Sequence, residues 1–177
     1  MRFPTLLLLI GIVGMPLQQA CAAEDNIMGP MTDTLKARVG TWNVEMRFRP
    51  AADAPESVSE ATQTNRLVGH WLVSELDGQM GTMPFSGVGL NGYDATRGIY
   101  VGTWCDSLSS RITPVEGRYE PSTGLFVTTS QEETKSGPRT VTSTTRTIDA
   151  NHEETTIDAV DAKGRHFTEF TIKLTRQ

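Results

Sequence analysis

Apolar and polar residues alternate along most of the chain beyond residue 40, a two-residue period typical of β-strands with one buried and one wet face. The clearest example is the segment from Gly40 to Pro50. Its apolar positions, which the pattern turns toward a core, are Trp42, Val44, Met46 and Phe48. This segment is therefore predicted to be a half-buried strand.

Further alternating runs follow at short intervals. They predict strands over residues 57–68, 70–77, 85–93, 99–106, 111–120, 125–132, 139–148, 152–160 and 165–176. Polar segments with turn residues separate several of these runs, at 77–82, 94–98, 121–124, 149–151 and 161–164. About ten strands joined by short turns predict an antiparallel meander. Because closure removes the edges of such a long sheet, the predicted fold is an all-β, up-and-down barrel.

One short helix is predicted before the first strand. Thr32 or Asp33 has a side chain suited to the N-cap, and the helix would run through Arg38. Its apolar content is thin, so we expect the helix to cover one end of the sheet rather than to form a layer.

The first 22 residues have the parts of a secretory signal peptide, namely a positive start, the apolar run 6–13 and small residues for cleavage. We therefore expect a signal peptide over residues 1–22, a flexible leader over 23–33 and a single domain over 34–177. The protein is expected to be exported, as a periplasmic or secreted protein. Cys21 follows Ala20, which leaves lipoprotein anchoring as an alternative, although Gln18 stands where an aliphatic residue is usual. If Cys21 is removed, Cys105 is the single thiol left and no intrachain disulfide is possible.

The charge balance of the chain argues against some classes of binding partner. The chain has 16 basic and 21 acidic residues, a formal net charge of −5, and no basic cluster. This balance argues against nucleic acid and anionic lipid headgroups as partners. Beyond the signal, no run is apolar enough for a transmembrane helix. The three histidines, His70, His152 and His166, are too scattered to form a metal motif.

The hairpin around residues 94–98 carries the candidate site. One face of its two strands combines aromatic residues, glycines and a carboxylate: Phe85, Gly87, Gly89, Asn91, Tyr93, Tyr100, Gly102, Trp104 and Asp106. Such a mixture suits the wall of a partly apolar cavity in which a few polar groups orient a ligand. The candidate ligand-binding residues are Phe85, Tyr93, Tyr100, Trp104, Asp106, Glu75 and Arg111.

The same residues have a structural interpretation. In it, the aromatic side chains are barrel core, Asp94 caps the hairpin turn, and Asp106 accepts backbone N–H groups at the end of a strand. Arg111 follows Asp106 closely enough to pair with it across a turn. Residues 87–92 match the string G-x-G-x-x-G, but they lie inside a predicted strand with no helix after it, so a dinucleotide site is rejected.

Two sets of residues resemble known families. Gly40-Thr41-Trp42 and Arg176 are similar to the lipocalin and fatty-acid-binding (calycin) superfamily, in which the tryptophan packs under the arginine and closes one end of the barrel. This resemblance implies structural roles for Gly40, Trp42 and Arg176. Residues 67–75, 92–94 and 100–107 resemble domain-of-unknown-function family 1579, whose members resemble calycin barrels and have no assigned activity. His70 and Cys105 depart from its pattern, where arginine and an aliphatic residue are expected.

The calycin resemblance also bears on cofactors. Some small calycin-like barrels hold haem through a histidine on a late strand, which makes His166 the one candidate ligand in this sequence. The predicted inward alternation of His166 with Thr168, Phe170 and Ile172 would suit that role. Apart from this alternative, no cofactor is expected.

No motif of the common catalytic classes occurs. The leading hypothesis is an exported protein that binds a small, largely apolar or amphipathic molecule. One alternative is a small exported hydrolase or isomerase that uses Asp106 in the barrel cavity. Another is a ligand-free barrel that acts through its loops as an envelope interaction module.

Overall fold

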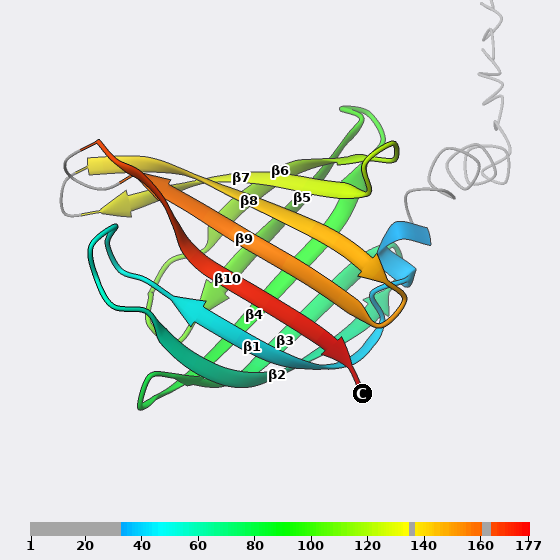
Figure 1. Cartoon of the computed structure of the whole chain (residues 1–177). Helices are drawn as coiled ribbons and strands as arrows, with labels where there is room; N and C mark the ends of the chain where they lie inside the picture. Colours follow the sequence, from blue (N-terminus) through cyan, green and yellow to red (C-terminus); the bar gives the residue numbers. More distant parts are fainter. Residues whose placement is uncertain (1–32, 135–136, 161–163) are drawn as a thin grey trace, which may run out of the picture.

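Ten antiparallel strands close into a barrel in which β10 pairs with β1 (Figure 1). The computed structural model describes residues 33–134, 137–160 and 164–177. The strands are β1 (Gly40–Phe48), β2 (Ser57–Val68), β3 (Trp71–Met80), β4 (Met83–Asp94), β5 (Ile99–Asp106), β6 (Thr113–Glu120), β7 (Leu125–Thr134), β8 (Gly137–Asp149), β9 (His152–Val160) and β10 (His166–Arg176). The predicted up-and-down barrel of about ten strands is confirmed.

One predicted turn is shorter than expected. Residues 77–82 carry turn signals, yet β3 continues to Met80, which pairs with Met83, so the turn is Gly81-Thr82. The left-handed backbone of Gly81 (φ +64°) lets the chain reverse there. Gly78 serves a different purpose, because a Cβ atom on it would lie 2.4 Å from the Cβ of Ala61 on β2. Gly78 therefore permits close contact between β3 and β2 rather than a turn.

Two apolar clusters fill part of the barrel. The larger cluster joins β1, β3, β4 and β10 through Trp42, Val44, Met46, Leu76, Phe85 and Leu174, all buried. The smaller one contains Leu35, Leu72 and Tyr100, with Tyr93, Tyr119 and Phe126 packed against it. The inward face predicted for β1 is thus confirmed.

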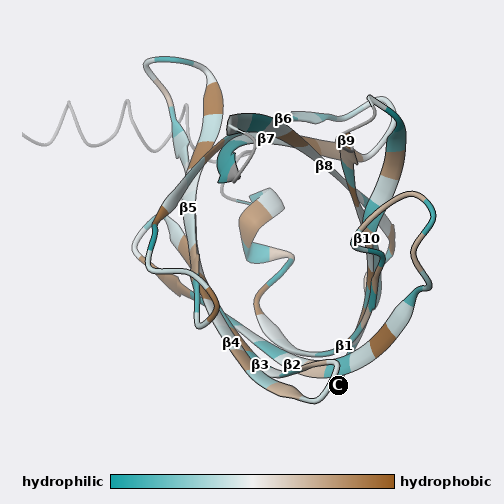
Figure 2. Ribbon diagram, turned by 90° about the vertical axis from the view of Figure 1, so that its left-hand side faces the viewer, coloured by the Kyte–Doolittle hydropathy of each residue, from teal (hydrophilic) through white to brown (hydrophobic). Residues whose placement is uncertain are grey.

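A short helix over residues 33–36 lies at one end of the barrel, within the ring of strands in Figure 2. Its Leu35 is 3% exposed and packs against Leu72 and Tyr100. The helix therefore closes this end, as predicted. Thr32, the alternative cap residue, lies outside the described residues.

Trp42 and Arg176 complete the closure, as the family resemblance implied. The guanidinium carbon of Arg176 lies 4.1 Å from the centre of the Trp42 ring. Arg176 also donates hydrogen bonds to the carbonyls of Ala37, Val39 and Ala150. Trp42 donates from Nε1 to the carbonyl of Arg38, 3.0 Å away. A cation on an indole face and satisfied backbone carbonyls lock the segment after the helix onto β1 and β10.

The β8–β9 turn lies beside this closed end and is held by Asp149. Its Oδ1 accepts the N–H of Asn151 at 2.7 Å, and its carboxylate contacts Nδ1 of His152 at 2.8 Å. The Asn151 N–H and then the His152 ring hold the pKa of Asp149 below its usual value of 3.8.

We expect Asp149→Asn to lower the free energy of unfolding at neutral pH by a small amount. A carboxyl group whose pKa is lowered on folding stabilises the fold above its unfolded pKa, and this contribution is lost as the pH falls through the folded value. The difference between wild type and variant should therefore be constant above about pH 5 and shrink below the ordinary aspartate pKa. Urea unfolding at pH 7, 5 and 3 measures it, and a difference that grows on acidification would contradict this account.

The predicted signal peptide, most of the leader and Cys21 lie outside the described residues. Within the described ranges, no helix has the length and apolar character needed to cross a bilayer.

Candidate functional site

Some apolar side chains that point into the barrel keep part of their surface exposed. Ile157, Phe170 and Ile172 share the inward face of β9 and β10 with Leu174, by their register. Leu174 is buried, whereas these three are only half-buried. Because strand pairing closes the wall all the way round, their exposed surface faces space within the barrel. The interior beside these three residues is therefore packed incompletely, although Phe170 stacks on Phe48 and Ile172 packs against the larger cluster.

Hydroxyl groups line the inner wall formed by β6, β7, β8 and β9. The inward positions here include Thr113, Thr128, Ser130, Ser143, Thr145 and Thr155. The hydroxyls of Thr145 and Thr155 bond to each other at 2.7 Å. Those of Thr128, Ser130 and Ser143 have no hydrogen-bond partner among the described residues. In the described ranges, one side-chain polar atom is both sealed from solvent and without a partner, and it is Nε of Arg49. The three hydroxyls are therefore accessible. Three free hydroxyls thus face the interior space.

Trp104 forms the aromatic part of the inner wall. Its ring lies flat over β4, where a Cβ on Gly87 would be 2.3 Å from Cζ2 and one on Gly89 would be 3.3 Å from Cε3. Nε1 of Trp104 donates to Oδ2 of Asp106 at 3.0 Å. The room that the glycines of β4 make is thus occupied by this indole. Phe85, also predicted to line the site, is buried in the larger apolar cluster beside Trp104.

The two candidate tyrosines belong to the closed end. The ring of Tyr100 lies 5.2 Å from that of Tyr93 and 4.8 Å from that of Phe126, both edge to face. Tyr100 is 3% exposed, and this burial raises the pKa of its hydroxyl. Tyr93 and Tyr100 face inward as predicted, but they belong to the buried cluster around Leu35 of the helix.

Asp106 and Asp94 have the contacts of the structural interpretation. Asp106 accepts the N–H of Leu108 at 2.9 Å as well as the indole N–H, so both of its oxygens are occupied. Asp94 accepts the N–H groups of Thr96 and Arg97, each at 3.0 Å, and caps the hairpin turn.

Glu75 and Arg111 do not join the inner wall. Glu75 lies opposite Val88 on the outer face of β3 and pairs with Arg66 at 3.2 Å. Glu75 lies between Ser74 and Leu76, which face inward, so its side chain faces outward. Arg111 is exposed in the β5–β6 connection, and among the described residues no ion pair joins it to Asp106. The Asp106–Arg111 pair that the sequence left open is therefore not formed, and the inward position expected for Glu75 is wrong.

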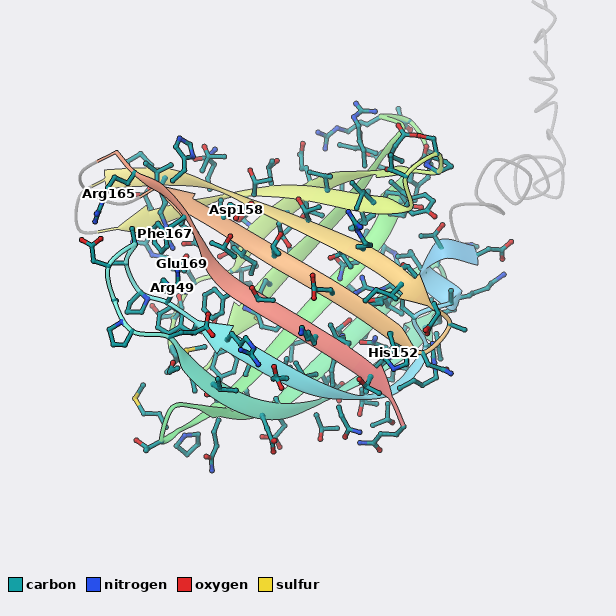
Figure 3. The ribbon with its side chains drawn as sticks, in the orientation of Figure 1. Arg49, His152, Asp158, Arg165, Phe167 and Glu169 are labelled. Carbon is teal, nitrogen blue, oxygen red and sulfur yellow. The ribbon has the colours of Figure 1, made fainter. Side chains whose placement is uncertain are left out.

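A charged cluster that the sequence did not reveal lies at the opposite end, where β1, β7 and β9 end, and which we call the far end. Nη2 of Arg139 on β8 lies 2.7 Å from Glu132 on β7 and 2.8 Å from Glu169 on β10. Burial by itself would lower the pKa of Arg139, but the hydrogen bonds with both glutamates outweigh it and raise the pKa. Figure 3 shows Glu169 and Phe167 at this end and His152 at the other.

A β-bulge between Thr168 and Phe170 explains why Glu169 was missed. The extra residue changes the alternation of β10, so Glu169 becomes buried and reaches Arg139 across β9. An unbroken alternation would have left it on the outer face. Glu132 and Arg139 lie opposite each other beside the β7–β8 turn, so their opposite charges were the one available signal.

The histidines do not suit a haem held inside the barrel. His166 lies opposite the exposed Val160, while the next pair, Phe167 and Ala159, faces inward. The predicted inward face of His166 is therefore wrong, because the bulge reverses the alternation of β10. His70 and His152 are exposed as well. Among the described residues, no three His, Cys, Asp or Glu side chains are placed to hold a metal ion.

Comparison with known proteins agrees with this barrel. The family described as "Protein of unknown function (DUF1579)" matches residues 28–176. The chain belongs to this family. A crystal structure of Rv2717c from M. tuberculosis is similar in fold, with a TM-score of 0.64 at 11% identity over 84% of this chain and 98% of that one. A redesigned β-barrel matches with a TM-score of 0.40 at 18% identity, over 81% of this chain and 94% of that one. No curated protein matches the sequence.

The family assignment extends over all ten strands and the closing helix of this DUF1579 member. It includes both ends of the barrel, from Trp42 and Arg176 to the cluster around Arg139. The family description names no activity, so the chemistry of the interior has to be argued from the side chains themselves.

Proposed function

We propose that this protein binds a small amphipathic molecule inside the barrel. The observation that carries the proposal is the half-buried state of Ile157, Phe170 and Ile172 on the inward face. Close-packed protein interiors leave few such gaps, so apolar side chains with exposed surface inside a closed wall support a ligand site. The ligand would place its apolar face against Trp104, Phe170 and Ile172 and its polar groups toward the hydroxyls of β7 and β8.

Export is part of the same proposal. It rests on the N-terminal sequence, with its positive start, apolar run and small residues before Glu24. A barrel that carries a ligand outside the cytoplasm must hold it without an intrachain disulfide if Cys21 is removed with the signal. Packing and hydrogen bonding of the ten strands would then supply the stability.

Native mass spectrometry of the full chain, purified from a host that exports it, tests both parts. We expect the mass of a chain that begins after Ala22, plus the mass of one bound ligand per chain, which denaturation releases. Trp104→Ala should reduce the bound fraction at least tenfold, because it removes the aromatic face of the site. The matched control is Trp71→Ala, since Trp71 lies on the outer face of β3 over Gly92 and should leave the bound fraction unchanged.

If wild type and Trp104→Ala have equal bound fractions, the ligand does not bind against Trp104. A wild-type chain with no extra mass, and with no uptake of the neutral dye Nile red, would overturn the binding proposal. A mature mass that still contains the first 22 residues would overturn the export part alone.

The alternative of an enzyme required Asp106 to be free to act inside the barrel, with Arg111 or a histidine beside it. Both Asp106 oxygens are occupied by N–H donors, and Arg111 lies outside the barrel wall. No second function is proposed from these residues.

A further inference from the structure

Three arginines at the ends of the barrel are matched by acceptors. Among the described residues, these three arginines lie at the two ends of the barrel: Arg38, Arg139 and Arg176. No lysine or histidine of the described ranges joins them, because Lys36, Lys173, His70, His152 and His166 are exposed. The availability of positive charge to a bound ligand therefore depends on these three guanidinium groups.

At the far end, Arg139 contacts two carboxylates. Its Nε and Nη2 bond to Glu132 at 3.0 and 2.7 Å, and its Nη1 and Nη2 bond to Glu169 at 3.3 and 2.8 Å. One positive charge thus faces two negative charges, and the cluster carries a net negative charge. Arg49, at the same end, pairs with Glu56 at 3.5 Å through Nη2, while its Nε is sealed from solvent and has no partner among the described residues.

At the closed end, the other two arginines are equally engaged. Arg38 pairs with Glu153 at 2.8 Å, and the carboxylate of Glu153 is only 5% exposed. Arg176 donates to three backbone carbonyls and lies on the ring of Trp42. Taking either arginine for a ligand would leave a buried acceptor without its partner, which costs free energy.

The remaining polar groups of the interior are uncharged, apart from Asp106. Ser74 is 7% exposed, its hydroxyl has no partner among the described residues, and it lies opposite Gly89 on the Trp104 side. Across the barrel are the free hydroxyls of Thr128, Ser130 and Ser143. Hydroxyls both donate and accept, so they match neutral hydroxyl, carbonyl or amide groups.

We infer that the ligand of this barrel is an uncharged amphipathic molecule, and that the barrel rejects carboxylates because Glu132 and Glu169 occupy Arg139. This inference rests on the proposed function. An anion that entered would lose its hydration, meet no free cation, and approach a cluster that is already negative. A neutral molecule would lose far less hydration free energy and could form hydrogen bonds with the hydroxyls of Thr128, Ser130 and Ser143.

Displacement of Nile red by decan-1-ol and by decanoate at pH 7 tests the inference with matched ten-carbon probes. Wild type should bind decan-1-ol at least tenfold more tightly than decanoate. In Glu132→Gln/Glu169→Gln, Arg139 keeps hydrogen-bond partners but loses both countercharges. This variant should bind decanoate at least tenfold more tightly than wild type does, with decan-1-ol affinity changed less than threefold.

The control variant is Glu60→Gln/Glu75→Gln, which removes two outward carboxylates and makes the same change in net charge. It should leave decanoate binding as in wild type. Circular dichroism checks that both variants keep the barrel.

The outcomes separate the two levels of the proposal. If decanoate binds wild type as tightly as decan-1-ol does, or if the far-end variant gains no decanoate affinity, the ligand class is wrong while the binding function stands. If the control variant gains as much, overall charge and not Arg139 sets the selectivity, and the inference is overturned. If wild type binds neither Nile red nor either probe, the proposed function fails together with it.

Discussion

Replacing Trp42 by alanine should destabilise the barrel severely, by about 3–5 kcal/mol in the free energy of unfolding. The side chain is 1% exposed and lies at the centre of the larger apolar cluster. Its removal leaves a cavity the size of an indole, takes the donor from the Arg38 carbonyl and removes the ring beneath Arg176. Urea unfolding followed by circular dichroism measures the loss.

Two further variants show which of these contacts matters. Trp42→Phe keeps an aromatic face for Arg176 but loses the N–H donor, so it should cost less, about 1–3 kcal/mol. Trp71→Ala removes an indole that is 41% exposed on the outer wall and should cost less than about 1 kcal/mol. A loss at Trp71 as large as that at Trp42 would mean that the closed end is not the point where the barrel is held together.

The wall of the barrel could be predicted from sequence because each strand has one wet face. In β1, the alternation of Trp42, Val44 and Met46 with polar residues indicated both the strand and its inward side, and the structure agrees. The β9 boundaries, His152 to Val160, follow from the turn signals on either side. The closure by Arg176 depended on the family resemblance, since alternation alone says nothing about which residues meet at a barrel end.

The site could be predicted only in part, because alternation gives the side of the sheet and not the place along the barrel. Tyr100 and Trp104 share the inward face of β5, yet Tyr100 packs under the helix while Trp104 lies opposite Thr113 and packs against the larger cluster. The burial of Glu169 depends on a bulge, and the incomplete packing beside Phe170 and Ile172 depends on the sum of all inward side-chain volumes. Neither property leaves a local pattern in the sequence.

Trp104 connects the fold to the proposed site, and Gly87 tests that connection. No positive φ is required at Gly87, so alanine can adopt its backbone. The added Cβ would lie 2.3 Å from Cζ2 and 2.6 Å from Cη2 of the indole, so the ring must leave its place on β4. We expect Gly87→Ala to lower the free energy of unfolding by about 1–3 kcal/mol, as overpacked cores do. Ligand or Nile red binding should fall with it, because the displaced ring moves into the interior space.

Gly89 provides the matched control, since a Cβ there would lie 3.3 Å from Cε3 and needs only a slight shift of the ring. Gly89→Ala should therefore cost much less than Gly87→Ala. In the background of Trp104→Ala, the collision at Gly87 disappears, and Gly87→Ala should become neutral or stabilise the fold by about 0.4–1 kcal/mol through the unfolded chain. This reversal of sign is specific to a ring that rests on the glycine. If the two substitutions instead add, the indole does not lie on β4, and the aromatic wall assigned to the ligand has to be placed elsewhere in the barrel.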